Sequence, residues 1–349
     1  MHQLQCEGFR NLQPLRLHPH PRLNVLVGPN GAGKTSLLEA IYFLSRVRSF
    51  RTRTLDRIVG WQARQARVIA LRGEDRLAVA RSPGTTALRL NGRDAPSRSE
   101  LTSRLPVQLI NTEHQRLLLD GPRVRRQFLD WGAFHVEPGY RDSALRYQHA
   151  LRQRNAALRH GDLRQGRAWL QPLAEAASQV DQARAAFVSA LTPIWEELVQ
   201  HWLAQPDLEL RYDPGAAADG EWLAHFQRTM ERDQQLGHTR TGPHRADLQL
   251  QKGRIPAVDA LSRGQQKLLV LALLVAEIAL WAKRGLRPVL LIDDLAAELD
   301  AEHLALVLHT LCEQDAQLFL TAIDPGWVPL QQRAAHWYRL QAGEAAPMV

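Results

Sequence analysis

Residue types that bind phosphate come together near the N-terminus. Residues 28–36 read GPNGAGKTS and lie between an apolar run, LNVLV, and a segment with helical spacing of apolar residues. Glycines let backbone amides curl around an anion, and a helix N-terminus favours negative charge. In this pattern the lysine reaches the β- and γ-phosphates and the threonine hydroxyl binds Mg²⁺. We therefore predict an ATP-binding loop made of Gly28, Pro29, Asn30, Gly31, Ala32, Gly33, Lys34, Thr35 and Ser36.

A second set of residues could hold the metal ion. The apolar segment VLLI at 289–292 ends in Asp293 and Asp294. Taken alone, this pattern could be a strand that ends in two solvated acids. Beside a phosphate loop, Asp293 is the expected partner of Thr35 in binding Mg²⁺. Asp294 is then placed to orient or polarise the attacking water, so Asp294 and Lys34 are the predicted catalytic residues for hydrolysis of ATP to ADP and phosphate.

A third segment begins a long apolar helix. Ser262 and Gln265 satisfy a capping box, which explains both residues without any ligand. The sequence LSRGQQ at 261–266 also resembles the signature motif of ABC ATPases, and AELD at 297–300 resembles the loop after the second carboxylate. In that class the signature of one protomer closes over the γ-phosphate held by the other. The resemblance implies an ATP-dependent homodimer. The residues that each protomer contributes in trans to the ATP site of the other are Ser262, Gly264, Gln265 and Asp300.

Further segments resemble the RecF family of DNA replication and repair proteins, relatives of the SMC and Rad50 ATPase heads. They are FRN at 9–11, SFRT at 49–52, RRQFLD at 125–130, QRN at 153–155, GPHR at 242–245 and LSRGQQK at 261–267. The resemblance extends from residue 7 to about 325 and is weakest over 160–235. It implies a DNA-binding protein controlled by ATP that acts at gaps with the RecR and RecO proteins and helps RecA to load. It also places Arg10 and Asn11 at the ATP site.

Two positions bear on turnover. Transporter ATPases carry a histidine after the last strand that contacts the γ-phosphate, whereas LFLTAID at 318–324 offers Thr321. We therefore expect a weak, DNA-stimulated ATPase. The resemblance also implies a glutamate in the segment that links the two lobes, which we place at Glu113, although a glutamine lies two positions later at Gln115.

The net charge of +8 favours an anionic partner such as nucleic acid or an acidic membrane surface. Residues 40–81 contain ten arginines and three acids, and residues 122–170 contain ten arginines and four acids. Such basic stretches suit contact with the DNA backbone, although they could also be solvated faces. The candidate DNA contacts are Arg46, Arg48, Arg51 and Arg53, of which Arg51 could instead serve the nucleotide site.

The cellular compartment follows from the cysteines and the apolar runs. Cys6 and Cys312 lie far apart without paired spacing, so the sequence predicts neither a disulfide framework nor a zinc site. The N-terminus does not resemble a signal peptide. The longest apolar run, 268–282, is too short to span a bilayer and contains Glu277. We expect a cytoplasmic protein, and we interpret this run as a buried helix.

The elements that must position these residues alternate between strands and helices. Strand patterns occur in LQCEGF, LRLHP, RLNVLV, ARVIAL, RLAVAR and ALRLNG, and later in RADLQLQ, PVLLIDD and AQLFLTA. Helical periodicity dominates from about residue 122 to 236. The predicted fold is α/β: an ABC-type P-loop ATPase head with a mixed β sheet and an inserted, mainly helical second lobe. The expected domains are an ATPase lobe at 1–121 and 239–349 and a helical lobe at 122–238.

The resulting hypothesis is an ATP-dependent DNA-binding protein of recombinational repair and replication restart. ATP binding would join two heads on duplex DNA or at gapped and single-strand junctions, and slow hydrolysis would separate them. One alternative is a structural DNA clamp that binds ATP with negligible turnover. Another is a transporter ATPase subunit, which Thr321, the long helical insertion and the segments FRN and GPHR disfavour.

Overall fold

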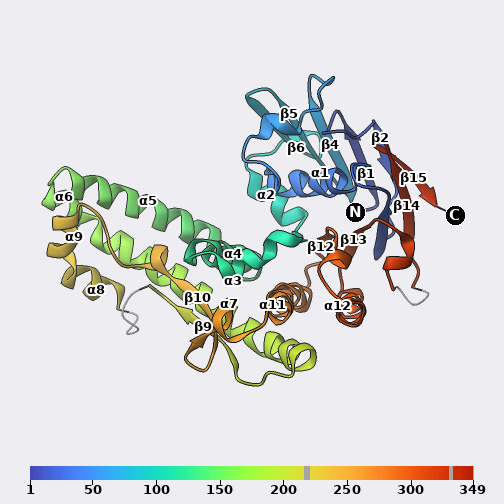
Figure 1. Ribbon diagram of the computed structural model, residues 1–349. Coiled ribbons are helices and arrows are strands. Elements are labelled where there is room, and N and C mark those ends of the chain that lie inside the picture. The colour runs from blue at the N-terminus through green and yellow to red at the C-terminus, as the bar shows by residue number, and fades with distance from the viewer. Residues whose placement is uncertain (216–220, 330–332, 349) are drawn as a thin grey trace. The chain divides into compact units, whose positions relative to one another are not determined.

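The computed structural model describes residues 1–215, 221–329 and 333–348. The chain forms two compact units (Figure 1). Unit 1 combines Met1–His114 with Trp281–Val349, and unit 2 is Gln115–Leu280. Unit 2 is therefore an insertion between two segments of unit 1.

Unit 1 contains an antiparallel sheet of six strands in the order β2-β1-β4-β5-β6-β7. The turn between β6 and β7 is Asn91-Gly92, where both residues have positive φ, as a tight hairpin turn requires. The strands are β1 (Gln3–Glu7), β2 (Leu15–Leu17), β4 (Ala66–Arg72), β5 (Asp75–Ser82), β6 (Thr85–Leu90) and β7 (Arg93–Asp94).

The second sheet of unit 1 is mainly parallel and has the order β15-β14-β3-β13-β12-β8. Its strands are β3 (Leu23–Val27), β8 (Val107–Ile110), β12 (Val289–Ile292), β13 (Gln317–Ala322), β14 (His336–Gln341) and β15 (Glu344–Met348). Only β15 runs antiparallel to its neighbour. Every residue of β3, β12 and β13 is buried, as is typical of parallel strands covered on both faces. Parallel pairing puts the carboxyl ends of these three strands at the same edge.

Helix α1 (Lys34–Arg46) makes contacts with strands of both sheets of unit 1. Its apolar residues join a hydrophobic cluster that also includes residues of β1, β4 and β5. Burial of the helix between two sheets fixes its N-terminus at the edge where β3 ends. The other helices of unit 1 are α2 (Arg98–Arg104), α12 (Ala301–Glu313) and the short turns η1 (Leu55–Ile58), η2 (Thr112–Gln115), η4 (Leu295–Ala297) and η5 (Pro325–Trp327).

Unit 2 is mainly helical. Its long helices α5 and α7 run side by side (Figure 1). It also carries a three-stranded sheet in the order β11-β10-β9. Its helices are α3 (Arg116–Leu119), α4 (Pro122–Val136), α5 (Tyr140–Arg159), α6 (Leu163–Ala168), α7 (Leu170–Leu203), α8 (Trp222–Arg228), α9 (Met230–Leu236), η3 (Pro243–Arg245), α10 (Ala257–Ala260) and α11 (Arg263–Lys283), and its strands are β9 (Leu208–Asp213), β10 (Asp247–Lys252) and β11 (Ile255–Pro256).

The α/β fold class predicted from the sequence is confirmed, and each predicted strand and long helix is present. Strands β7, β8, β9, β11, β14 and β15 were missed. The compact units divide after His114 and Leu280, whereas the sequence predicted domain boundaries at 121 and 238. The reason is β10, which pairs antiparallel with β9 over its whole length and so draws residues 247–252 into the inserted unit.

The apolar helix α11 is the one helix in the described part of the chain that is long and apolar enough to cross a membrane. Within its apolar window, 72% of the residues are buried inside the structure. Such burial is typical of a core helix. The interpretation of 268–282 as a buried helix is confirmed.

Candidate functional site

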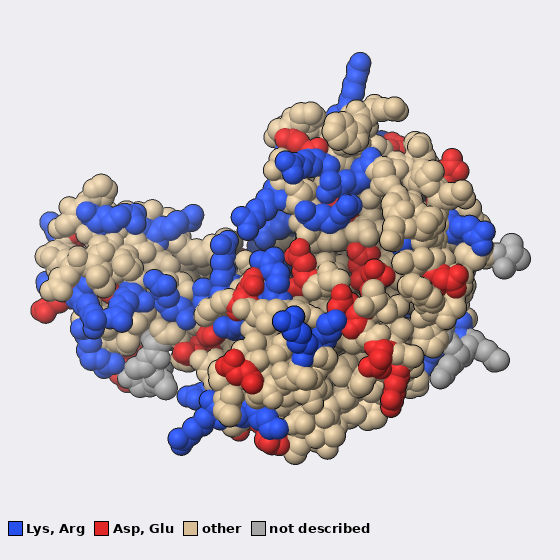
Figure 2. Space-filling model, viewed as in Figure 1, with Lys and Arg blue, Asp and Glu red and all other residues tan. Residues whose placement is uncertain are grey.

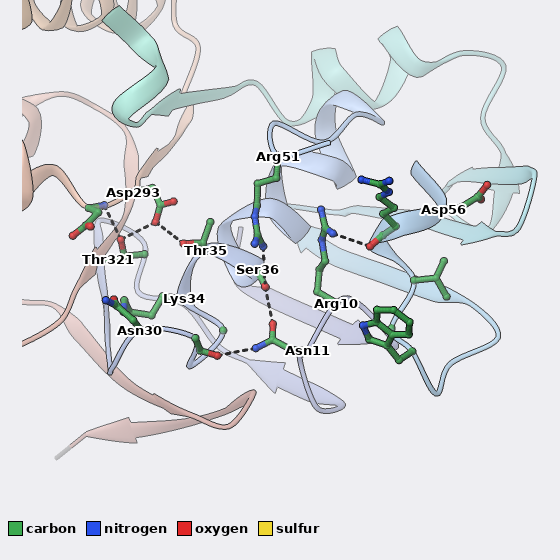
Figure 3. Close-up of a pocket in the computed structure, with 17 residues that line it drawn as sticks. Arg10, Asn11, Asn30, Lys34, Thr35, Ser36, Arg51, Asp56, Asp293 and Thr321 are labelled. Carbon is green, nitrogen blue, oxygen red and sulfur yellow. Dashed lines mark hydrogen bonds between the residues drawn. The ribbon is translucent and has the colours of Figure 1, made fainter. Parts of the chain in front are cut away.

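A cavity of about 940 Å³ opens in unit 1 at the edge where β3, β12 and β13 end. It has two ends (Figure 3): Lys34, Thr35, Asp293 and Thr321 lie at one end, and Asp56 lies at the other. The residues that line it are Arg10, Asn11, Asn30, Gly31, Gly33, Lys34, Thr35, Ser36, Arg51, Asp56, Arg57, Val59, Gly60, Trp61, Asp293, Asp294 and Thr321.

The loop between β3 and α1 depends on two glycines. Gly33 precedes the first residue of α1 with a φ of 109°, a conformation that side chains disfavour. A Cβ atom on Gly28 would lie 2.2 Å from the carbonyl oxygen of Leu340 in β14. The C-terminal strand β14 therefore packs against the start of the loop and leaves room only for glycine there.

Lys34 points back over this loop. Its Nζ donates hydrogen bonds to the carbonyl oxygens of Gly28 at 2.6 Å and Pro29 at 3.1 Å. Burial lowers the pKa of Lys34, and the nearby Asp294 and Asp293 act in the opposite direction. The ammonium group is thus held at the concave side of a loop whose shape suits phosphate.

Asp293 accepts hydrogen bonds from two hydroxyl groups. Thr35 Oγ1 lies 3.1 Å and Thr321 Oγ1 lies 3.0 Å from the same oxygen, Oδ1. Burial raises the pKa of Asp293, although both hydrogen bonds oppose the shift. A hydroxyl and a carboxylate at this distance fit Mg²⁺, which prefers oxygen ligands and could be bound by both. The residues present are therefore compatible with the predicted metal site.

Asp294 adopts a left-handed backbone conformation with a φ of 57°. Its N–H donates to Thr321 Oγ1 at 2.9 Å, so one threonine connects both carboxylate residues. This bond fixes the turn after β12, and the Asp294 side chain lines the cavity. Thr321 lies in the segment where transporter ATPases carry a histidine and this chain has none.

A buried carboxylate, Glu39, organises the arginines in the middle of the cavity. Arg10 donates to both Glu39 oxygens, at 2.9 Å from Nε and 2.7 Å from Nη2. Arg51 Nη1 lies 3.4 Å from Glu39, and Ser49 Oγ donates to it as well. The Glu39 side chain is fully buried, so the two arginines compensate a charge that would otherwise be costly.

Asn11 ties the loop to α1. Its amide nitrogen donates to the Gly31 carbonyl oxygen at 2.9 Å, and its amide oxygen accepts from Ser36 Oγ at 2.8 Å. Both residues predicted at the site from the FRN segment, Arg10 and Asn11, thus line the cavity. Within the loop, Ala32 is buried and its N–H donates to the Pro29 carbonyl oxygen at 3.2 Å.

The residues predicted to act in trans occupy helix starts. Ser262 and Gln265 form a reciprocal capping box before α11, with distances of 3.0 and 3.4 Å, and Gly264 is exposed beside them. Asp300 caps α12 by accepting from the N–H of His303 at 3.0 Å, which lowers the pKa of Asp300. Ser262 and Gln265 therefore cap α11, as the sequence pattern predicts. Ser262, Gly264 and Gln265 belong to unit 2, and the cavity residues belong to unit 1.

The four arginines proposed for DNA differ in their surroundings. Arg51 lines the nucleotide cavity, which favours the alternative role stated for it. The Arg46 guanidinium lies 5.6 Å from the centre of the Tyr42 ring. Arg48 and Arg53 are exposed. Glu113 and Gln115 lie in η2 and are absent from the residues that line the cavity.

Sequence reasoning missed the function of Glu39 and of the residues at the far end of the cavity. Glu39 gave a signal, since it is an acid within the apolar run SLLEAIYFL of a helix that is otherwise buried. Arg57 and Trp61 gave none, because Arg57 lies in the short turn η1 and Trp61 follows it on a loop, and neither segment has a recognisable motif. Trp61 is fully exposed although it lines the cavity.

Comparison with known proteins agrees with this geometry. The family model described as the RecF/RecN/SMC N terminal domain matches residues 1–344. The DNA replication and repair protein RecF of Pseudomonas entomophila (strain L48) is 41% identical over 334 residues, covering 93% of this chain and 91% of that protein. RecF of Pseudomonas aeruginosa (strain LESB58) is 42% identical over 340 residues, covering 93% and 92%.

Solved structures give the same fold. The recombination mediator protein RecF with ATP, described as part of the RecFOR pathway, has a TM-score of 0.85 at 22% identity and covers 99% of this chain and 97% of its own. An Smc head bound to the C-winged helix domain of ScpA has a TM-score of 0.62 at 15% identity, with coverage of 99% and 96%.

Proposed function

Because the chain belongs to the RecF family of DNA replication and repair proteins, we propose that it is an ATP-dependent DNA-binding protein of recombinational repair and replication restart. The observation that carries the proposal is the meeting of Lys34, Thr35, Asp293 and Asp294 in one cavity. Since a similar protein has been solved with ATP, ATP is the ligand to expect. The protein would act in the cytoplasm, where bacterial DNA lies.

The loop would bind the triphosphate. Backbone amides around Gly31 and Gly33 would surround the β-phosphate, and Lys34 would leave the carbonyl oxygens of Gly28 and Pro29 to contact the β- and γ-phosphates. Thr35 and Asp293 would hold Mg²⁺, which when bound neutralises charge on the phosphate oxygens. Arg10, held by Glu39, would add a fixed positive charge beside the loop.

Hydrolysis would depend on Asp294. Thr321 fixes the backbone at Asp294, and the carboxylate of Asp294, which lines the cavity, would orient a water molecule and accept a proton. In this structure no imidazole accompanies it among the residues that line the cavity. The γ-phosphate would therefore lack one donor that transporter ATPases supply, which supports slow turnover.

Dimerisation would complete the site. Ser262 and Gly264 are exposed at the start of α11, where backbone N–H groups and a hydroxyl can approach an anion. We expect these residues, with Gln265 and Asp300, to close over the γ-phosphate bound by a second copy. ATP would then hold two heads together on DNA at gaps, and family membership favours RecR and RecO as partners and assistance to RecA loading as the outcome.

The test uses two variants and labelled gapped duplex DNA in fluorescence anisotropy. Lys34→Met removes the phosphate contact, so it should neither dimerise with ATP nor show ATP-dependent DNA binding. Asp294→Asn keeps the binding residues, so it should dimerise and stay on DNA longer than the unaltered protein. Binding of DNA by Lys34→Met with the affinity and ATP response of the unaltered protein would falsify the proposal.

A second candidate, a DNA clamp with negligible ATP turnover, is favoured by one observation. The hydroxyl of Thr321 is occupied by hydrogen bonds to Asp293 and Asp294, so it offers little to a γ-phosphate. Steady-state phosphate release with and without DNA separates the two candidates. Stimulation by DNA that disappears in Asp294→Asn would exclude the clamp.

A further inference from the structure

A second cavity, of about 820 Å³, lies in unit 2 and has a basic lining. Arg232, Arg240 and Arg245 are all exposed in it, and no acidic residue is among those that line it. Within the described part of the chain, none of the three guanidinium groups has an ion pair or a side-chain hydrogen bond. The remaining residues that line it are Gly215, Gln235, Leu236, His238 and Thr241.

The backbone beneath these arginines is fixed by buried polar groups. Residues 237–245, which we name the basic loop, follow α9 and end with the turn η3. Arg154 of α5 and Asp233 of α9 form an ion pair of 2.9 Å, and both side chains are fully buried. Asp233 Oδ1 accepts the N–H of Arg240 at 3.0 Å, and Asn155 Oδ1 accepts the N–H of Thr239 at 2.8 Å.

The second half of the basic loop is held equally firmly. His244 bonds the Tyr147 hydroxyl at 2.7 Å and the Thr239 carbonyl oxygen at 3.1 Å. Arg184 Nη1 donates to the Pro243 carbonyl oxygen at 2.6 Å. Between these points, Thr241 Oγ1 lies 2.7 Å from His225 Nε2. The main chain of the loop is thus anchored at both ends and in the middle.

This network explains two segments that the nucleotide cavity does not use. Arg154 and Asn155 come from QRN, and His244 and Arg245 come from GPHR. A buried ion pair is costly to form and adds little net stability, so its clearest effect is to fix a conformation. Fixing the loop orders the positions of Arg240 and Arg245 before a ligand arrives, which reduces the entropy lost on binding.

We propose that the basic loop is a preformed binding site for the phosphodiester backbone of DNA. This inference rests on the proposed DNA-binding function. Guanidinium groups match phosphate oxygens bidentately, and no acidic residue among those that line the cavity competes with a phosphate for them. Lys and Arg side chains also gather over unit 2 on the face shown in Figure 2. The site would give affinity without reading base sequence.

The experiment compares the double variant Arg240→Ala/Arg245→Ala with Arg254→Ala. Arg254 is also an exposed arginine of unit 2, but it lies in the turn after β10, about 17 Å along that strand from the loop. Binding of labelled gapped duplex is measured with ATP over a series of salt concentrations. Each lost phosphate contact reduces the slope of log K against log salt by about 0.9, so the double variant should lose about 2 and the control nothing.

The outcomes separate the site from the wider function. A double variant with the slope and affinity of the unaltered protein overturns the site while leaving the proposed function intact. Failure of the unaltered protein to bind DNA overturns both. Inorganic phosphate is tested by thermal unfolding: if it raises the Tm of the unaltered protein but not of the double variant, while their DNA slopes agree, the loop holds a free anion and the proposal is overturned.

Discussion

Glu39 is a fully buried carboxylate of unit 1 and Asp293 is a half-buried one, and the two have different partners. Glu39 is compensated by the guanidinium groups of Arg10 and Arg51. Asp293 accepts hydrogen bonds from the hydroxyl groups of Thr35 and Thr321, and burial raises its pKa. A carboxylate that is held by hydroxyl groups within a phosphate site is suited to bind a metal ion. A carboxylate thus has a structural role at Glu39, whereas Asp293 stays the predicted metal ligand.

Trp61 carries a prediction about the base of the nucleotide. Its indole is exposed on the cavity wall, away from the phosphate loop in sequence. Stacking of a base on an aromatic side chain contributes about 1–3 kcal/mol by alanine substitution. We expect Trp61→Ala to weaken ATP binding roughly 5- to 150-fold in isothermal titration calorimetry. Trp61→Phe should keep most of the affinity, and equal affinity of all three proteins would remove Trp61 from the site.

His244 predicts a pH dependence of stability. Burial lowers its pKa to about 4, and Arg245 and Arg126 act in the same direction, whereas the hydrogen bond to Thr239 opposes them. In the unfolded chain the pKa is about 6.5. Between these values the unfolded chain binds a proton and the folded chain does not. The stabilisation is therefore complete above about pH 6.5 and is lost as the pH falls toward 4, a total of about 3 kcal/mol.

Urea unfolding at several pH values measures this effect against His244→Gln. The variant lacks the titrating ring, so its stability should change less between about pH 6.5 and 4. Identical pH profiles for the two proteins would show that His244 is not the titrating group.

At the scale of elements, α4 and α7 approach closely at Gly132. A Cβ on Gly132 would lie 2.1 Å from Cζ of Phe187, whose side chain is fully buried. Gly132→Ala should therefore overpack this contact, at a cost of about 1–3 kcal/mol. In Gly166→Ala the new methyl group would meet Met230 at 3.4 Å, an ordinary contact, so the gain in helix propensity should stabilise by up to about 1 kcal/mol.

Urea denaturation followed by circular dichroism distinguishes the two alanine variants by the sign of the change in midpoint. Loss of stability in Gly132→Ala with a gain in Gly166→Ala is the expected pair. If both variants shifted in the same direction, the close approach of α4 and α7 would not be the deciding factor.

At the scale of the whole molecule, the number of arginines in the two basic stretches overestimates how much positive charge these stretches expose to solvent. Several arginines of the two basic stretches are satisfied inside the protein, such as Arg154 with Asp233 and Arg125 with Asp247. Basic residues outside those stretches, including Arg240 and Arg245, are exposed instead. Counting charges along the sequence therefore indicates an anionic partner but does not locate its contacts.

A mixture of two inactive variants tests whether the ATP site is shared between protomers. Lys34→Met and Ser262→Arg should each abolish DNA-stimulated phosphate release. Mixed together, they should recover part of it, because one site of a mixed dimer then has both residues intact. A mixture of Lys34→Met with Asp294→Asn should recover nothing, since both residues serve the site of their own chain. Absence of recovery in the first mixture would contradict a shared site.

The sequence alone determined the features that depend on neighbours in the chain. The phosphate-binding glycines, lysine and threonine all lie within residues 28–36. The capping box of Ser262 with Gln265 spans one helical turn. Strands and helices with a clear periodicity of apolar residues could be predicted for the same reason. Hydrophobic patterning and short-range hydrogen bonds are encoded locally, so they can be read without the fold.

Only the tertiary structure decided which distant residues meet. Parallel pairing of β3, β13 and β12 brings Thr35 to Asp293 across 258 positions of the chain. Pairing of β9 with β10 moved the domain boundary, and burial made Arg154 a structural residue while leaving Arg240 exposed. An arginine has the same local pattern whether it binds an internal carboxylate or an external phosphate. Packing decides between them, because it determines whether an acid lies within reach.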